Sequence, residues 1–276
     1  MRIDAHQHFW QYNKEKHSWI TDEMKVIRRD FPPGDLFPHL EETNIDGSIA
    51  VQADETLRET EYLLDLSDQN NWIKAVVGWA DIGDDQLDEV LDKFSLQKKL
   101  KGFREVLQSK DLDYMLRKEF IRGIHKLGKR GYTYDILIFP EHLDATLKLV
   151  SKCPDQPFVI DHLAKPKIKD GEWKVWKKKM SLLAERELVS CKLSGMVTEA
   201  DLKKWKPEDL LPYLEIALEQ FGPERLMYGS DWPVCLVASE YEKVFEVVDR
   251  FTDSLSAGEK ARILGESAKE FYGIKE

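Results

Sequence analysis

The chain has 276 residues, 42% of them hydrophobic, which allows either one large domain with a sizeable core or two smaller domains. Its formal net charge is −10 and its basic residues form no long block, so we expect neither nucleic acid nor an anionic membrane as a partner. Three scattered cysteines (Cys153, Cys191 and Cys235) indicate no disulfide framework, and no apolar run has membrane-spanning length, so we expect a cytoplasmic protein.

Short β-rich runs alternate along the chain with longer amphipathic stretches. We predict strands near 2–8, 47–52, 74–79, 100–104, 132–138, 158–161, 188–193 and 225–229. Helical patterns lie between them at 59–71, 86–94, 120–130, 141–150 and 212–222, and a final helix or helix pair is predicted within 254–273.

Eight strands that alternate with helices favour a parallel sheet with right-handed crossovers. We therefore predict a single (β/α)₈ barrel domain over 1–276, with no linker or internal repeat. A doubly wound sheet is the alternative. It is weakened because no glycine-rich phosphate-binding motif follows a predicted strand.

The first predicted strand, within MRIDAHQHFW, carries His6 and His8 two positions apart. On a regular strand alternate side chains point to opposite faces, so we expect Asp4, His6 and His8 on one face. Two adjacent neutral imidazoles suit a divalent metal ion, or they hold a proton and orient a polar substrate. The pair falls at the carboxyl end of its strand, where (β/α)₈ barrels build their active sites.

Polar residues also follow several later strands, and the barrel would bring them to the histidine pair. They are Arg104 in KGFREVLQ, His162 and Lys165 in VIDHLAKP, Lys192 and Ser194 in CKLSGM, and Asp231 in RLMYGSDWPVC. A structural role stays open for two of them, because Arg104 could pair with a neighbouring acid and Lys192 could sit inside the barrel among acids.

Asp231 is the candidate that a structural role explains least well. It follows an apolar strand and precedes Trp232 and Pro233, and backbone that approaches a proline is biased toward extended geometry, which makes a poor helix start. We therefore expect its carboxylate to point into the cavity at the strand ends. We expect the same of the His162 imidazole.

The segments DAHQHFW, VVGWADI, KGFREVLQ, VIDHLAKP, CKLSGM, FGPERLMYGSDWPVC and ILGESAKEFYG occur in this order over essentially the whole chain. Together they resemble the sugar-lactone hydrolase branch of the amidohydrolase superfamily (amidohydrolase 2 type). The resemblance implies a (β/α)₈ barrel that hydrolyses the cyclic ester of a sugar acid, such as L-fucono- or L-rhamnonolactone. Two departures concern specificity: Glu105 follows Arg104 where the family usually has histidine, and Ala164 stands where a glycine often precedes Lys-Pro.

For lactone hydrolysis, the resemblance implies that Asp231 is the base that activates water. We also expect His6, His8, His162 and Arg104 to surround the carbonyl, with one or more of them stabilising the oxyanion directly or through a metal. His162 or Lys165 could return the proton to the ring oxygen.

The same reading gives His6, His8 and Asp231 as three ligands of one divalent ion, with zinc the leading identity. The fifth predicted strand lacks the histidine or lysine that metal-dependent relatives place there, so we do not expect a two-metal site. Hydrolysis without any metal stays open.

Four tryptophans lie at or just beyond the ends of predicted strands: Trp10, Trp19, Trp79 and Trp232. Tryptophan rings suit a deoxysugar because they pair an apolar face with a polar edge. We expect Trp10, Trp79 and Trp232 to contact the substrate, together with Arg104 and Lys165. Ordinary core packing is the alternative for each tryptophan.

Two other functions stay open. The same barrel could act as a metal-dependent decarboxylase or as a hydrolase of an aromatic lactone carboxylic acid, although carboxylate substrates would favour more than one strand-end arginine. A sugar-binding barrel without catalysis is the third possibility. The sequence leaves open whether the chain forms a homo-oligomer.

Overall fold

Within residues 1–275, which the computed structural model describes, each of the eight runs predicted as strands forms a strand. All neighbouring strands pair in parallel, in sequence order. They are β1 (Ile3–Gln7), β2 (Gly47–Val51), β3 (Ile73–Gly78), β4 (Leu100–Glu105), β5 (Thr133–Ile136), β6 (Phe158–Ile160), β7 (Val189–Leu193) and β8 (Leu226–Tyr228).

The sheet curls until its last strand meets its first. His8 N donates to Trp232 O at 2.7 Å, and Asp231 N donates to His6 O at 2.8 Å, just beyond the end of β8. The fold is therefore the predicted (β/α)₈ barrel and not a doubly wound sheet. This closure places the first strand beside the segment that follows the last strand, so His6 and Asp231 become neighbours.

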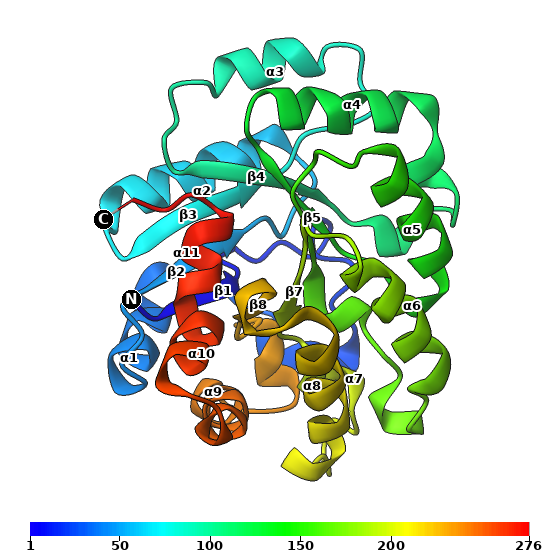
Figure 1. Ribbon diagram of the computed structural model, residues 1–276. Coiled ribbons are helices and arrows are strands. Elements are labelled where there is room, and N and C mark those ends of the chain that lie inside the picture. Colours follow the sequence, from blue (N-terminus) through cyan, green and yellow to red (C-terminus); the bar gives the residue numbers. More distant parts are fainter. Residues whose placement is uncertain (276) are drawn as a thin grey trace.

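Helices pack around the outside of the barrel (Figure 1). They are α1 (Pro33–Glu42), α2 (Leu57–Gln69), α3 (Leu87–Lys93), α4 (Lys118–Lys129), α5 (Leu143–Lys152), α6 (Lys174–Ala184), α7 (Met196–Glu199), α8 (Pro207–Phe221), α9 (Tyr241–Phe251), α10 (Ala257–Ala261) and α11 (Ser267–Phe271). The last two are the predicted C-terminal helix pair. Over residues 1–275, no helix has the length and apolar character needed to cross a membrane.

The inside of the barrel has an apolar part and a charged part. The apolar part comes from β1, β2, β3, β6 and β8 and is closed by residues from α11 onward, and it contains Ile3, Ala5, Ile49, Val51, Ala75, Val77, Val159, Met227, Ala268, Tyr272 and Ile274. The charged part comes from β4, β5 and β7, where Arg104, Asp135 and Lys192 are all buried. Charge inside a barrel is costly unless it is paired, so this part of the interior is where function is expected.

The prediction that Asp4, His6 and His8 share one face is wrong for Asp4. Its carboxylate accepts a hydrogen bond from Tyr241 of α9 at 3.1 Å, on the outer side of the sheet, whereas the His6 imidazole lies 3.1 Å from Lys192 Nζ inside the barrel. The strict alternation fails because the pairing of β1 with β2 shifts register between Asp4 and Gln7. The shift turns His6 inward.

Candidate active site

A cavity of about 570 Å³ opens at the carboxyl ends of the strands. Most of the residues singled out in the sequence line it, namely His8, Trp10, Arg104, His162, Lys165 and Asp231. His6 lies beneath them with no exposed surface. Other lining residues come from the segment between β1 and α1, and they include Lys16 and Trp19.

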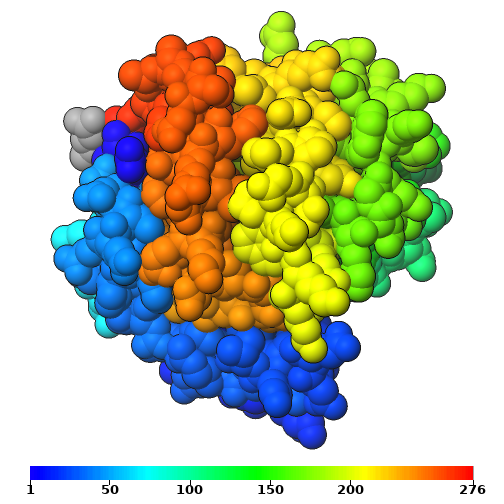
Figure 2. Space-filling view, turned by 90° about the horizontal axis from the view of Figure 1, so that it is seen from below, coloured from blue at the N-terminus to red at the C-terminus, as the bar shows by residue number. Residues whose placement is uncertain are grey.

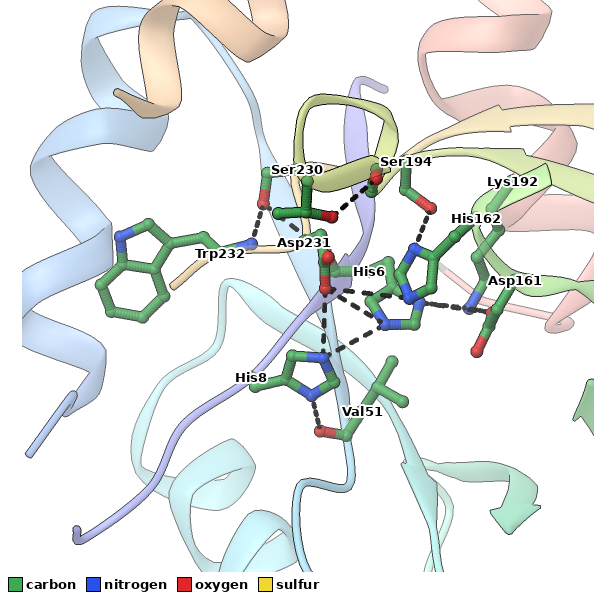
Figure 3. A network of polar contacts seen from close by, with 12 residues as sticks. His6, His8, Val51, Asp161, His162, Lys192, Ser194, Ser230, Asp231 and Trp232 are labelled. Carbon is green, nitrogen blue, oxygen red and sulfur yellow. Dashed lines mark hydrogen bonds and ion pairs between the residues drawn. The ribbon is translucent and has the colours of Figure 1, made fainter. Parts of the chain in front are cut away.

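The Asp231 carboxylate is the centre of the polar cluster in this cavity. Three imidazole nitrogens surround its Oδ1 atom: Nε2 of His8 at 3.4 Å, Nε2 of His162 at 3.8 Å and Nε2 of His6 at 3.9 Å (Figure 3). The structure thus brings together, around one oxygen, the four residues that the sequence proposed as catalytic.

Two residues of this cluster sit on strained backbone. Asp231 has φ 58°, and the turn that follows β6 keeps His162 to Lys165 in the left-handed region, with φ between 50° and 58°. Each non-glycine residue there costs on the order of 1 kcal/mol, and such residues concentrate at functional sites. Tertiary contacts hold the turn, among them the Trp176 indole, which donates to Leu163 O at 2.7 Å. Ala164, at the position where the family often has glycine, shares this conformation.

Hydrogen bonds to the Nδ1 atoms orient the imidazoles. His8 Nδ1 lies 2.8 Å from Val51 O, a carbonyl that can only accept, so Nδ1 carries a proton, and the opposite ring nitrogen, Nε2, faces Asp231. His162 Nδ1 lies 2.9 Å from Ser194 Oγ, which likewise turns its Nε2 toward Asp231. Burial lowers the pKa of both His6 and His162 well below the usual value, so both are neutral at neutral pH.

Asp231 remains ionised despite its burial. Burial alone would raise its pKa, but the opposing effects of His162, His8 and Lys165 outweigh it, and the pKa falls below its usual value. The cavity therefore holds an ionised carboxylate beside the neutral imidazoles of His6 and His162, the protonation states that a base and metal ligands require.

A buried ion network lies under the cluster. Lys192 Nζ is 2.6 Å from Asp135 Oδ2 and 3.0 Å from Asp161 Oδ1, and Arg104 donates to Asp161 Oδ2 at 3.1 Å. The Tyr272 hydroxyl also donates to Asp135 Oδ2, at 2.7 Å. This is the structural role that the sequence left open for Lys192 and Arg104. Sequence reasoning missed both aspartates, although Asp161 immediately precedes His162 at a strand end.

Two of the predicted substrate contacts lie elsewhere. Trp232 is 1% exposed and packs edge-on against Phe9 and Phe31, with ring centroids 6.1 and 5.2 Å away. Trp79, which directly follows β3, forms two hydrogen bonds with the Thr60 hydroxyl: its backbone N–H donates to the hydroxyl oxygen, and its backbone carbonyl accepts from the hydroxyl. Among the described residues, neither lines the cavity, so we correct the expectation that they contact substrate. A position just beyond a strand end does not fix the direction of the side chain.

Gly195 lets His162 take its position. Its φ is +61°, and a Cβ built on it would lie 2.6 Å from His162 Nδ1. Gly195→Ala is therefore expected to push the imidazole away from Asp231 and to lower kcat by at least about tenfold. Steady-state kinetics, with unfolding followed in parallel, measures the effect.

Gly131→Ala is the matched control for that substitution, because Gly131 has φ +76° and open space around its Cβ position. This variant is expected to lose about 1 kcal/mol of unfolding free energy with kcat unchanged. Equal kcat losses in both variants would contradict the role given to Gly195.

Glu105, the departure from the family pattern, points away from the cavity. Its carboxylate accepts from Ile82 N at 2.8 Å and from the Tyr114 hydroxyl at 3.1 Å, on the outer side of β4. Burial raises its pKa from 4.5 to about 7. Because the folded state holds this proton more tightly than the unfolded chain does, the contribution of Glu105 to stability is fully present below pH 4.5 and is lost as pH rises through about 7.

Glu105→Gln is expected to reduce that loss. Between pH 5 and 8 the unfolding free energy of the variant should fall by on the order of 2 kcal/mol less than that of the wild type. Denaturant titrations across this range measure the difference, with the exposed Glu215→Gln as control. Parallel curves for Glu105→Gln and wild type would refute the assignment.

Comparison with known proteins finds similarity to amidohydrolases and to sugar-lactone hydrolases. Residues 3–274 match a family model described as amidohydrolase. An L-fucono-1,5-lactonase from Burkholderia multivorans (strain ATCC 17616 / 249) is 38% identical over 288 residues, an alignment that covers 100% of this chain and 97% of that protein. An L-fucono-1,5-lactonase from Burkholderia ambifaria is 35% identical and covers 99% of this chain and 96% of its own length.

Among solved structures, an amidohydrolase from Burkholderia multivorans with bound zinc superposes with a TM-score of 0.97 at 37% identity, and each chain covers 100% of the other.

Proposed function

Because the chain belongs to the amidohydrolase family, we propose that it hydrolyses the ring ester of a sugar-acid lactone, of the 6-deoxyhexonic class that the names of its lactonase relatives indicate. The observation that carries the proposal is the arrangement at the cavity floor, where one ionised carboxylate oxygen faces three imidazole Nε2 atoms at 3.4 to 3.9 Å.

One divalent ion fits this cluster. With Nδ1 protonated, a neutral His8 presents the lone pair of Nε2, which lies 3.2 Å from His6 Nε2 and 3.4 Å from Asp231 Oδ1, and His6 Nε2 is 3.9 Å from the same oxygen. Ligands that bind a tetrahedral zinc ion at about 2.0–2.1 Å are separated by about 3.3 Å. Converging acceptor atoms repel one another unless a cation or a proton lies between them. Arg104 Nη1 lies 3.2 Å from His6 Nε2. Its N–H group offsets part of this repulsion, and it would compete with the ion for the lone pair of His6 Nε2.

The ligands would therefore be His6, His8 and Asp231, and zinc suits their nitrogen and oxygen atoms. When bound, such an ion supplies Lewis-acid polarisation of the lactone carbonyl.

The protein's own groups account for the remaining steps. Asp231 takes a proton from the attacking water, and the new C–O bond forms as the carbonyl becomes an oxyanion. Arg104, which points its guanidinium toward the same cluster, stabilises that negative charge. The bond to the ring oxygen then breaks. That oxygen takes its proton either from the Lys165 ammonium, which Asp231 afterwards restores, or through His162, which passes on the proton that Asp231 took from water.

The charges around the cavity favour a neutral substrate. The cations that line it, among the described residues, each have an acidic partner: Lys16 with Asp54, Arg104 with Asp161, and Lys165 with Glu199. A substrate carboxylate would have to displace one of these partners. This argues against the alternative of an aromatic lactone carboxylic acid and against decarboxylation.

The test is a panel of 6-deoxyhexono-1,4- and 1,5-lactones, with acid release followed by a pH indicator in the presence and absence of a chelator. We expect turnover well above the spontaneous rate for at least one lactone, a loss of rate on chelation and recovery with zinc. If no lactone is hydrolysed above background, the proposal fails. Undiminished turnover after complete metal removal would overturn the metal assignment alone.

A further inference from the structure

The segment between β1 and α1 forms one wall of the cavity. It projects as a blue lobe in Figure 2. Its ends are tied together, because Trp10 and Phe31 exchange backbone hydrogen bonds of 3.3 and 2.9 Å, and its own Ile20 and Ile27 are buried. Arg28 also donates to Ile20 O at 2.9 Å. The segment is therefore a prebuilt structure that can hold a side chain in a fixed position.

Aromatic rings run from the catalytic cluster to the cavity mouth along this segment. The Trp10 ring lies 6.5 Å from that of His8, and Trp19 packs edge-on against Trp10 at 6.0 Å and 90°. Trp10 is 2% exposed and its indole donates to Arg29 O. Trp19, in contrast, lines the cavity and is 41% exposed. An exposed indole at a cavity wall leaves apolar surface free for a ligand.

Polar groups line the same cavity as this indole. Lys16, on the same segment, reaches across to Asp54 at 3.2 Å, and both line the cavity. A cavity that offers an apolar ring face together with paired polar groups suits a ligand with one carbon–hydrogen face and several hydroxyls.

We propose that Trp19 is a specificity-determining residue, which packs on the carbon–hydrogen face of the sugar lactone at the end remote from the ester. This inference rests on the proposed function and adds the residue that selects the sugar. Contact with a part of the substrate that does not react contributes to binding in the ground state and the transition state alike, so its loss raises KM and leaves kcat in place.

The experiment compares Trp19→Ala, Trp19→Phe and Trp173→Ala on the best lactone of the panel. Trp173 is a matched control, since it is 38% exposed and belongs to a hollow beside α6. We expect KM to rise about tenfold or more in Trp19→Ala with kcat within about threefold, KM to return to within about threefold of wild type in Trp19→Phe, and no change in Trp173→Ala. An unchanged KM in Trp19→Ala, or a fall in kcat with no rise in KM, overturns the inference.

A binding measurement separates this inference from the proposed function. Calorimetry with the intact lactone on Asp231→Asn, with and without Trp19→Ala, requires no turnover. A Kd at least about tenfold weaker in the double variant supports the role of Trp19 even if the wild type hydrolyses nothing. Equal Kd values, or no binding to either protein, refute it.

Discussion

Asp231→Asn is expected to lower kcat for lactone hydrolysis by at least about a thousandfold. Asparagine has nearly the same volume as aspartate but cannot take a proton from water. The measurement is the steady-state rate of acid release on the best substrate, with folding checked by circular dichroism.

The control for this variant is Asp253→Asn, which replaces the same side chain at an exposed pair with Lys260 far from the cavity. It should retain wild-type kcat within about twofold. A folded Asp231→Asn variant that keeps more than about a tenth of wild-type kcat would rule out the role of Asp231 as base.

Lys192→Met is expected to cost about 3–5 kcal/mol of unfolding free energy. Lys192 lies inside the barrel with no exposed surface, and its ammonium is the shared partner of Asp135 and Asp161. Without the ammonium, the carboxylates of Asp135 and Asp161 stay buried but lose the positive charge that both of them contact. Burial and the neighbouring Asp161 already raise the pKa of Asp135 to about 6, and Lys192 opposes that rise. Urea unfolding measures the loss.

The double variant Lys192→Met with Asp135→Asn removes one of the uncompensated charges and should recover about 1 kcal/mol or more. It also keeps the prediction testable if the single variant does not fold. Lys177→Met breaks an exposed pair with Glu219 and should change stability by no more than about 0.5 kcal/mol. If Lys192→Met loses no more unfolding free energy than this control, the buried ion network does not stabilise the fold.

The barrel could be predicted from sequence because each strand is a short β-rich run between amphipathic stretches, and the eight runs fall in regular alternation. Helix boundaries were predicted less closely. The helix predicted at 59–71 is α2, which runs from Leu57 to Gln69 and is capped by Thr56, whose hydroxyl accepts a hydrogen bond from Glu59 N. Less could be predicted where backbone leaves regular geometry: no local pattern signals the register shift in β1 or the left-handed turn from His162 to Lys165.

Among the site residues, too, some could be predicted from the sequence and others could not. His6, His8, His162 and Asp231 could be found because barrel topology fixes where strand ends lie. Asp161 and Asp135 were missed because only the folded interior makes them partners of Lys192. Trp232 was misplaced because its ring turns into the outer core. Trp19 was singled out as an aromatic residue near a strand end, and it reaches the cavity through the fold of the segment between β1 and α1.

The most direct measurement of the central claim is a crystal structure of Asp231→Asn with an intact 6-deoxyhexonolactone. We predict that the lactone carbonyl lies against His8 and Arg104 at the cavity floor, and that the carbons remote from the ester lie on Trp19. A lactone bound outside this cavity, or bound with its carbonyl turned toward the mouth, would contradict the account.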